Sequence, residues 1–118
     1  MILPEIISKE PLGPVTRDGD PAWTGLVRWT LYGLINAEEL GMTDESVEGN
    51  RAQATTLGRA AVAPLGLAED WLASVIASAG NYGQIFDRNL GESSPLGIRR
   101  GANALWTEGG ILYAPPMQ

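Results

Sequence analysis

Two pairs of carboxylates have a spacing that could suit catalysis or metal binding. Glu38 and Glu39 are adjacent, and adjacent side chains on a helix point about 100° apart, so they do not face one substrate as an acid–base pair must. Asp18 and Asp20 flank a glycine as in a calcium loop, but the later ligand positions of such a loop are not filled. We therefore expect Glu38 and Glu39 to form a solvated helix end, and Asp18 and Asp20 to act as caps.

Two other motifs resemble anion-binding sites in part. Residues 80–83 (GNYG) precede a predicted helix, but no predicted strand comes before them and no Lys-Ser or Lys-Thr pair follows, so a phosphate loop is not predicted. Arg99 and Arg100 could hold a carboxylate or phosphate, but adjacent arginines are more often exposed or paired locally. Ser8 and Lys9 are unsuited to a dyad, because neighbours on a strand face opposite ways.

The four tryptophans could form a stacking platform for sugar rings or bases. Three of them lie in apolar stretches of predicted helices, where large aromatic side chains are usually buried. We therefore expect core packing rather than ligand binding. The four residues are Trp23, Trp29, Trp71 and Trp106.

The composition excludes several kinds of chemistry. The 118 residues include no Cys and no His, so thiolate nucleophiles, disulfides, Ser-His-Asp triads and Cys or His metal ligands are absent from the sequence. Eight Lys and Arg stand against 14 Asp and Glu, for a net charge of -6. This balance disfavours a nucleic-acid partner, whose phosphates must be neutralised. We expect no enzyme activity, no cofactor and no metal.

The beginning of the chain shows no targeting segment. Residues 1–5 (MILPE) lack the basic and apolar regions of a signal peptide. No apolar run approaches the roughly 18 residues of a membrane span. As written, the sequence predicts a cytoplasmic chain without membrane insertion.

Helices joined by glycine-rich breaks are expected to position these residues. Asp20 and Pro21 begin a helix of about 20 residues, with apolar side chains at spacings of three and four, and Gly41 ends it. The remaining elements follow from similar signals. They are a turn over 43–47, a helix over 51–58, a surface connection over 60–67, helices over 71–79 and 82–90, a weak helix over 96–106 and an extended tail over 111–116.

The first 17 residues are expected to be extended. Three prolines interrupt residues 2–17, and the β-branched residues between them favour strands. One or two short strands are predicted, with a bend at Glu10, Pro11, Leu12 and Gly13.

Four stretches of the sequence together carry a resemblance to one known family. They are 3–15 (LPEIISKEPLGPV), 27–31 (VRWTL) with 36–41 (NAEELG), 80–86 (GNYGQIF) with 89–91 (NLG), and 103–107 (NALWT) with 109–110 (GG) and 113–116 (YAPP). In this order they resemble the C-terminal part of the general L-amino-acid-binding proteins of bacterial ABC transporters, which are type II, two-lobe periplasmic binding proteins. The resemblance spans nearly the whole chain and is poorest over residues 48–67.

The resemblance implies a mainly α fold with an N-terminal extended hinge strand, the C-terminal portion of lobe 1 of an α/β architecture. Residues 1–17 would be the hinge segment, with Glu10, Pro11, Leu12 and Gly13 as hinge residues, and residues 18–118 the helical part of lobe 1. The family grips its amino acid with residues that lie upstream of this part. No ligand-binding residue is therefore assigned, and Arg17 is only the nearest conceivable contributor.

The function that the resemblance implies is solute capture for amino-acid import, by a truncated component that does not bind ligand alone. Amino acid and ABC permease would be partners of the full-length parent only. The family is periplasmic, in contrast to the cytoplasmic chain predicted above.

Self-association is a further expectation. An isolated hinge strand is an exposed apolar edge, so we expect a homo-oligomer formed through the N-terminal strand or by helix exchange. The alternative function is a stand-alone, small helical structural or interaction protein.

Overall fold

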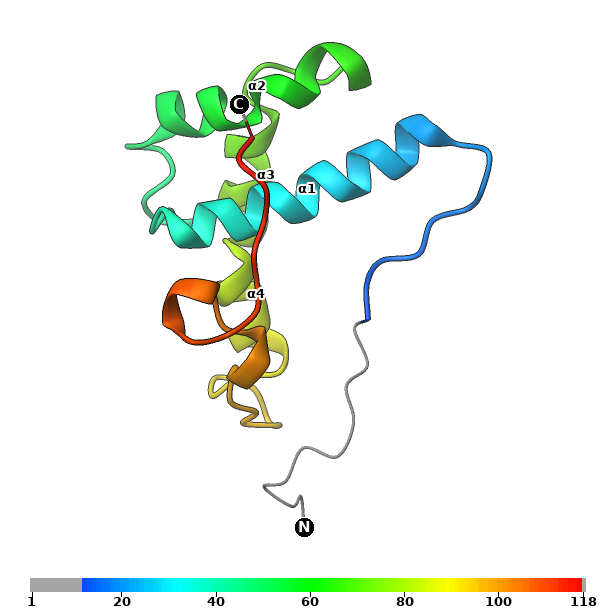
Figure 1. Ribbon diagram of the computed structural model, residues 1–118. Helices are drawn as coiled ribbons and strands as arrows, with labels where there is room; N and C mark the ends of the chain where they lie inside the picture. The colour runs from blue at the N-terminus through cyan, green and yellow to red at the C-terminus, as the bar shows by residue number, and fades with distance from the viewer. Residues whose placement is uncertain (1–11, 118) are drawn as a thin grey trace.

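The computed structural model describes residues 12–117. Its helices are α1 (Pro21–Glu39), α2 (Arg51–Leu65), α3 (Trp71–Ala79) and α4 (Tyr82–Asn89), followed by two short 3₁₀ turns, η1 (Gly101–Asn103) and η2 (Trp106–Glu108). Within residues 12–117 there is no β-strand, only an isolated bridge between Leu105 and Leu112. Figure 1 shows α1 crossing the centre of the molecule, with the C-terminal tail running across it.

Helix α1 begins and ends where the sequence predicts. The Asp20 side chain accepts a hydrogen bond from the backbone N–H of Trp23 at 2.9 Å, and Pro21 occupies the first turn, where its missing N–H costs nothing. At the other end Gly41 adopts a left-handed φ of 67°. There the backbone N–H of Met42 returns to the carbonyl of Ala37 at 2.8 Å. This is the glycine-terminated helix end expected from the sequence.

Helix α2 is longer than predicted. The surface connection expected over residues 60–67 is wrong, because the helix continues through Pro64 to Leu65. Pro64 cannot donate a hydrogen bond to the carbonyl of Ala60, and only Leu65 follows it before Gly66 (φ 64°) ends the helix. Ala61 is fully buried in the core. Burial of this small apolar face outweighs the local cost of the proline.

Helices α3 and α4 confirm the predicted elements. Gly80, with φ 78°, ends α3. Asn81 begins α4 with a capping box, in which Asn81 and Gln84 each accept from the other's backbone N–H.

The predicted helix over residues 96–106 is wrong. Gly97 and Gly101 adopt left-handed φ values of 56° and 51°, which interrupt a right-handed helix. The chain instead forms a loop and the turns η1 and η2. As expected, residues 111–116 form no helix, and Leu112 makes an isolated bridge to Leu105.

Two clusters of buried side chains form the core. The main cluster joins α1, α2 and α3 to the C-terminal tail, which contributes Met117. The second, here called the C-terminal cluster, holds the tail on α1. Its buried members are Ile35, Leu105 and Ala114. The Asn36 amide also donates to the carbonyl of Pro115 at 3.2 Å.

The tryptophans divide into two classes. Trp71 is 7% exposed and donates its indole N–H to the carbonyl of Gly58 at 2.9 Å. Trp29 packs against the main cluster with partial burial. Trp23 and Trp106 are each 53% exposed. Core packing is therefore confirmed for Trp71 and Trp29 and wrong for the other two.

The N-terminal segment is described only in part. Residues 12–17 form no strand, and residues 1–11 of the predicted hinge strand lie outside the described range. Leu12 and Val15 are exposed. Among the described residues, no helix is both long and apolar enough to cross a membrane.

Candidate functional site

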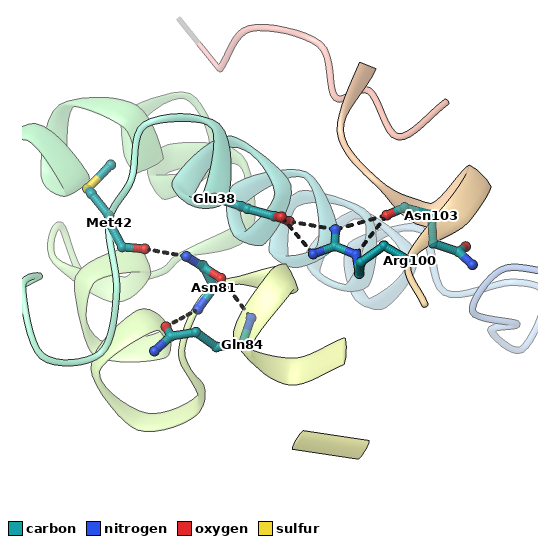
Figure 2. Close-up of polar contacts among 6 residues, drawn as sticks. All are labelled: Glu38, Met42, Asn81, Gln84, Arg100 and Asn103. Atoms are coloured by element: carbon teal, nitrogen blue, oxygen red, sulfur yellow. Dashed lines mark hydrogen bonds and ion pairs between the residues drawn. The ribbon is translucent and has the colours of Figure 1, made fainter. Parts of the chain in front are cut away.

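A half-buried ion pair joins the C-terminal loop to α1 (Figure 2). The Arg100 guanidinium donates from Nη1 and Nη2 to the two carboxylate oxygens of Glu38, at 2.8 and 3.1 Å. Nε and Nη2 also donate to the carbonyl of Asn103, at 3.1 and 2.9 Å. The side chains are 13% exposed for Glu38 and 26% for Arg100. A bidentate, largely desolvated pair of this kind fixes orientation as well as adding energy.

The aromatic side chains of α4 form one wall of this pair. The guanidinium carbon of Arg100 lies 5.1 Å from the ring centroid of Phe86 and 5.7 Å from that of Tyr82. Both distances fall within the range of cation–π attraction. Arg100 therefore links α1, α4 and η1 through one side chain.

The sequence-based interpretation of these two residues was wrong. Glu38 is not part of a solvated helix end, and Arg100 pairs with a carboxylate 62 positions away in addition to its local bonds to the carbonyl of Asn103. Gly83 carries a signal that was missed. A Cβ there would lie 2.7 Å from Glu38 Oε1 and 2.9 Å from Arg100 Nη1. Any side chain at this position would therefore displace the ends of the two paired side chains from the geometry seen here.

A second polar hub surrounds Asn81, which is 6% exposed (Figure 2). Its side chain donates to the carbonyl of Met42 at 2.8 Å and accepts from the backbone N–H of Gln84 at 2.9 Å. The Gln84 side chain in turn accepts from the backbone N–H of Asn81 and donates to Asp44. These bonds tie the start of α4 to the loop after α1. Residues 80–83 thus hold the end of α3 and the capped start of α4.

The predicted capping role is confirmed for Asp20, which caps α1. It is wrong for Asp18, whose carboxylate accepts from the backbone N–H of the adjacent Gly19 at 2.9 Å in the turn before the helix. Within residues 12–117, no group of His, Cys, Asp and Glu is arranged to hold a metal ion.

Among the described residues, one open cavity lies beside α4 and another along α2. One, of about 240 Å³, is lined by Gly83, Phe86, Asp87, Gly91, Glu92, Ile98 and Arg100. Hydrogen bonds from the Ser93 hydroxyl and backbone N–H lower the pKa of Asp87 there, and the carboxylate is already engaged by that loop. The other, of about 460 Å³, lies along α2 and is lined by Thr55, Arg59, Val62, Ala63 and Glu69.

The buried polar side chains of the described residues are all hydrogen-bonded within the protein. In the part of the chain that the structure describes, no buried side-chain N or O atom lacks a hydrogen-bond partner. A pre-formed ligand site normally presents a few convergent polar groups. The described residues present none that is both buried and unpaired.

The two predicted hinge residues that the structure describes are not gathered into a site. Leu12 and Gly13 are exposed and have no regular secondary structure, and a Cβ at Gly13 would meet no atom within 4 Å. Glu10 and Pro11 lie outside the described residues. Arg17 is also exposed. The hinge assignment therefore stays a prediction.

The Glu38–Arg100 pair should contribute measurably to stability. We expect Arg100→Ala to lower the free energy of unfolding by about 1–3 kcal/mol, because the half-buried Glu38 carboxylate loses its partner. Chemical denaturation followed by circular dichroism measures this change. Arg99→Ala is the matched control, since Arg99 is exposed. Equal values for the two variants would contradict the prediction.

Comparisons with known proteins give a consistent answer over the whole chain. The general L-amino acid-binding periplasmic protein AapJ of Rhizobium johnstonii is 51% identical over 127 residues, which cover 100% of this chain and 37% of that protein. The glutamate/glutamine/aspartate/asparagine-binding protein BztA of Rhodobacter capsulatus is 44% identical over 130 residues, with the same two coverages. No family model matches the chain.

A solved structure extends the comparison to the fold. An ABC transporter periplasmic binding protein from Brucella ovis with glutathione bound superposes with a TM-score of 0.86 at 44% identity, covering 100% of this chain and 40% of that one. The chain thus spans about 37% of the length of the curated relatives it matches. The resemblance stated from the sequence is confirmed, and these homologues are solute-binding proteins rather than enzymes.

Proposed function

We propose that this chain, which is homologous over its whole length to part of the amino-acid-binding proteins of ABC transporters, works as part of such a solute-binding component. The observation that carries the proposal is the whole-length match at 44% to 51% identity to proteins whose names specify amino-acid binding. The substrate class is L-amino acids, and the partners are an amino acid and an ABC permease. The working compartment is the periplasm, which the name of the Rhizobium johnstonii relative specifies.

We further propose that the chain alone has no amino-acid site. An α-carboxylate is usually held by a cation and oriented backbone N–H groups. Among the described residues, Arg100 is a half-buried cation that borders a cavity. Its guanidinium already donates hydrogen bonds to Glu38 and to the carbonyl of Asn103. The first turn of α4 is likewise capped by Asn81. In this proposal, the Arg100 ion pair and the Asn81 cap stabilise the fold rather than bind a ligand.

The role that fits these features is that of a scaffold. In this proposal residues 18–118 complete one lobe and residues 1–17 act as a hinge segment. Self-association through the N-terminal segment or by helix exchange stays a prediction. Such self-association would cover the side chains of Leu12 and Val15, which are exposed in the structure.

Isothermal titration tests the absence of a site. The chain is titrated with a panel of L-amino acids and with glutathione, and no binding heat is expected up to about 1 mM ligand. The Rhizobium johnstonii protein, titrated with the same panel, is the positive control. Micromolar binding by this chain would overturn the claim that it has no site, while leaving the family assignment intact.

A chimera tests the proposed role itself. The matched segment of the Rhizobium johnstonii protein is replaced by this chain. The chimera is expected to bind L-amino acids with affinity within about tenfold of the parent, because the scaffold leaves the ligand contacts unchanged. Circular dichroism and thermal unfolding establish that the chimera is folded. A folded chimera without amino-acid binding would contradict the scaffold role.

A further inference from the structure

An exposed aromatic cluster lies on the C-terminal turn, outside the polar network described above. The side chains of Trp106, Ile111 and Tyr113 are 53%, 73% and 59% exposed. The rings of Trp106 and Tyr113 meet edge to face, with centroids 6.3 Å apart. Large apolar side chains that gather on one surface commonly mark an interaction site.

The backbone dictates why these side chains face outward together. Leu105, Leu112 and Ala114 pack in the C-terminal cluster. Alternation along the tail turns Ile111 and Tyr113 toward solvent, and Trp106 begins the turn η2 directly after the buried Leu105. Backbone hydrogen bonds from Trp106 N–H to Leu112 and from Gly110 N–H to Leu105, both 3.0 Å, close the turn. The cluster is therefore held by the core and needs little ordering when a partner binds.

Carboxylates border the same surface. The indole N–H of Trp106 donates to Glu39 Oε1 at 3.3 Å, and Glu108 shares the turn η2 with Trp106. Both glutamates are exposed. Arg100, on the neighbouring turn, is paired with Glu38. We call the five residues Glu39, Trp106, Glu108, Ile111 and Tyr113 the acidic aromatic patch.

We propose that the acidic aromatic patch docks a partner protein surface that presents arginine or lysine among apolar side chains. A cation can pair with the glutamates and stack on the indole, while apolar side chains cover Ile111. A second copy of this chain is a poorer occupant. Two patches meeting face to face would oppose their own carboxylates, in a chain whose net charge is already -6. The proposal goes beyond solute binding and does not depend on it.

Titration with a defined peptide tests the patch. The ¹⁵N-labelled chain is titrated at low salt with the acetylated, amidated peptide Arg-Leu-Arg-Leu-Arg and followed by NMR. We expect shifts at the Trp106 indole N–H and at the backbone N–H groups of Ile111 and Tyr113. The glutamate analogue of the peptide should not bind, and added salt should weaken binding of the arginine peptide.

Three variants decide the outcome. Trp106→Ser, and separately the double variant Glu39→Gln with Glu108→Gln, should each weaken binding about threefold to tenfold. Trp23→Ser is the matched control, because Trp23 is also 53% exposed, and it should leave the affinity unchanged. If Trp106→Ser fails to fold, the glutamine variant decides, since it changes charge but not shape.

Three results would overturn the proposal. They are equal shifts at the Trp23 indole, affinity unchanged in the glutamine variant, and a dimer in sedimentation that Trp106→Ser dissociates. The last result would make a second copy the occupant of the patch.

Discussion

Trp71→Ala is expected to lower the free energy of unfolding by about 3–5 kcal/mol. The indole ring is buried between α2 and α3, and its N–H donates to the carbonyl of Gly58 at 2.9 Å. The ring packs so closely that a Cβ at Gly58 would lie 2.8 Å from its Nε1 atom. Removing the ring leaves a cavity that neighbouring backbone cannot easily fill. Urea denaturation followed by far-UV circular dichroism measures the loss.

Two variants separate cavity formation from other effects. Trp23→Ala removes the same side chain from a position that is 53% exposed, and we expect a change below about 1 kcal/mol. Trp71→Phe retains much of the apolar area but not the N–H donor, so an intermediate loss of about 1–2 kcal/mol is expected. The same loss for Trp71→Ala and Trp23→Ala would show that the buried ring does not hold the core together.

Gly110→Ala is expected to destabilise the C-terminal turn by about 2–4 kcal/mol. A Cβ at Gly110 would lie 1.8 Å from the carbonyl oxygen of Ala104. That atom belongs to the backbone, so no change of side-chain rotamer relieves the clash. The chain must move there, and the bond from Gly110 N–H to the Leu105 carbonyl would be strained with it.

Gly49→Ala is the matched control for that substitution. A Cβ at Gly49 would lie at an ordinary contact distance of 3.6 Å from the Ser46 carbonyl oxygen, and we expect a change within about 0.5 kcal/mol. Denaturation midpoints report global stability, and amide hydrogen exchange of Leu112 reports the turn. Unchanged exchange in Gly110→Ala would contradict the expectation.

The sequence predicted those elements whose signals are local. Asp20 with Pro21, and Asn81 with Gln84, are caps whose residues act within one helical turn, so the starts of α1 and α4 could be placed without tertiary information. The same holds for the glycines that end α1 and α3. Pro64 led to the wrong prediction for α2, because its local cost is outweighed by the burial of Ala61 against other helices. These contacts are long-range, so a short stretch of sequence does not show them.

The polar network could not be predicted for the same reason. Glu38 and Arg100 are 62 positions apart, and each has an ordinary surface role in its own segment. The glycine at position 83 is the one sequence feature that fits their contact, because it leaves space beside the pair. This can be recognised only once the position of α4 is known. The two exposed tryptophans were missed because hydrophobic character predicts burial on average, whereas position on the packed structure decides it.

The C-terminal tail also determines when this core can be completed during synthesis. Met117 lies in the same buried cluster as Ala37 and Leu72, which leave the ribosome much earlier. Helices α1, α2 and α3 can pair as they emerge, but the hollow that Met117 fills stays open until Met117 itself has left the ribosome. Until then a nascent chain exposes apolar surface, and chaperone binding is favoured in that interval.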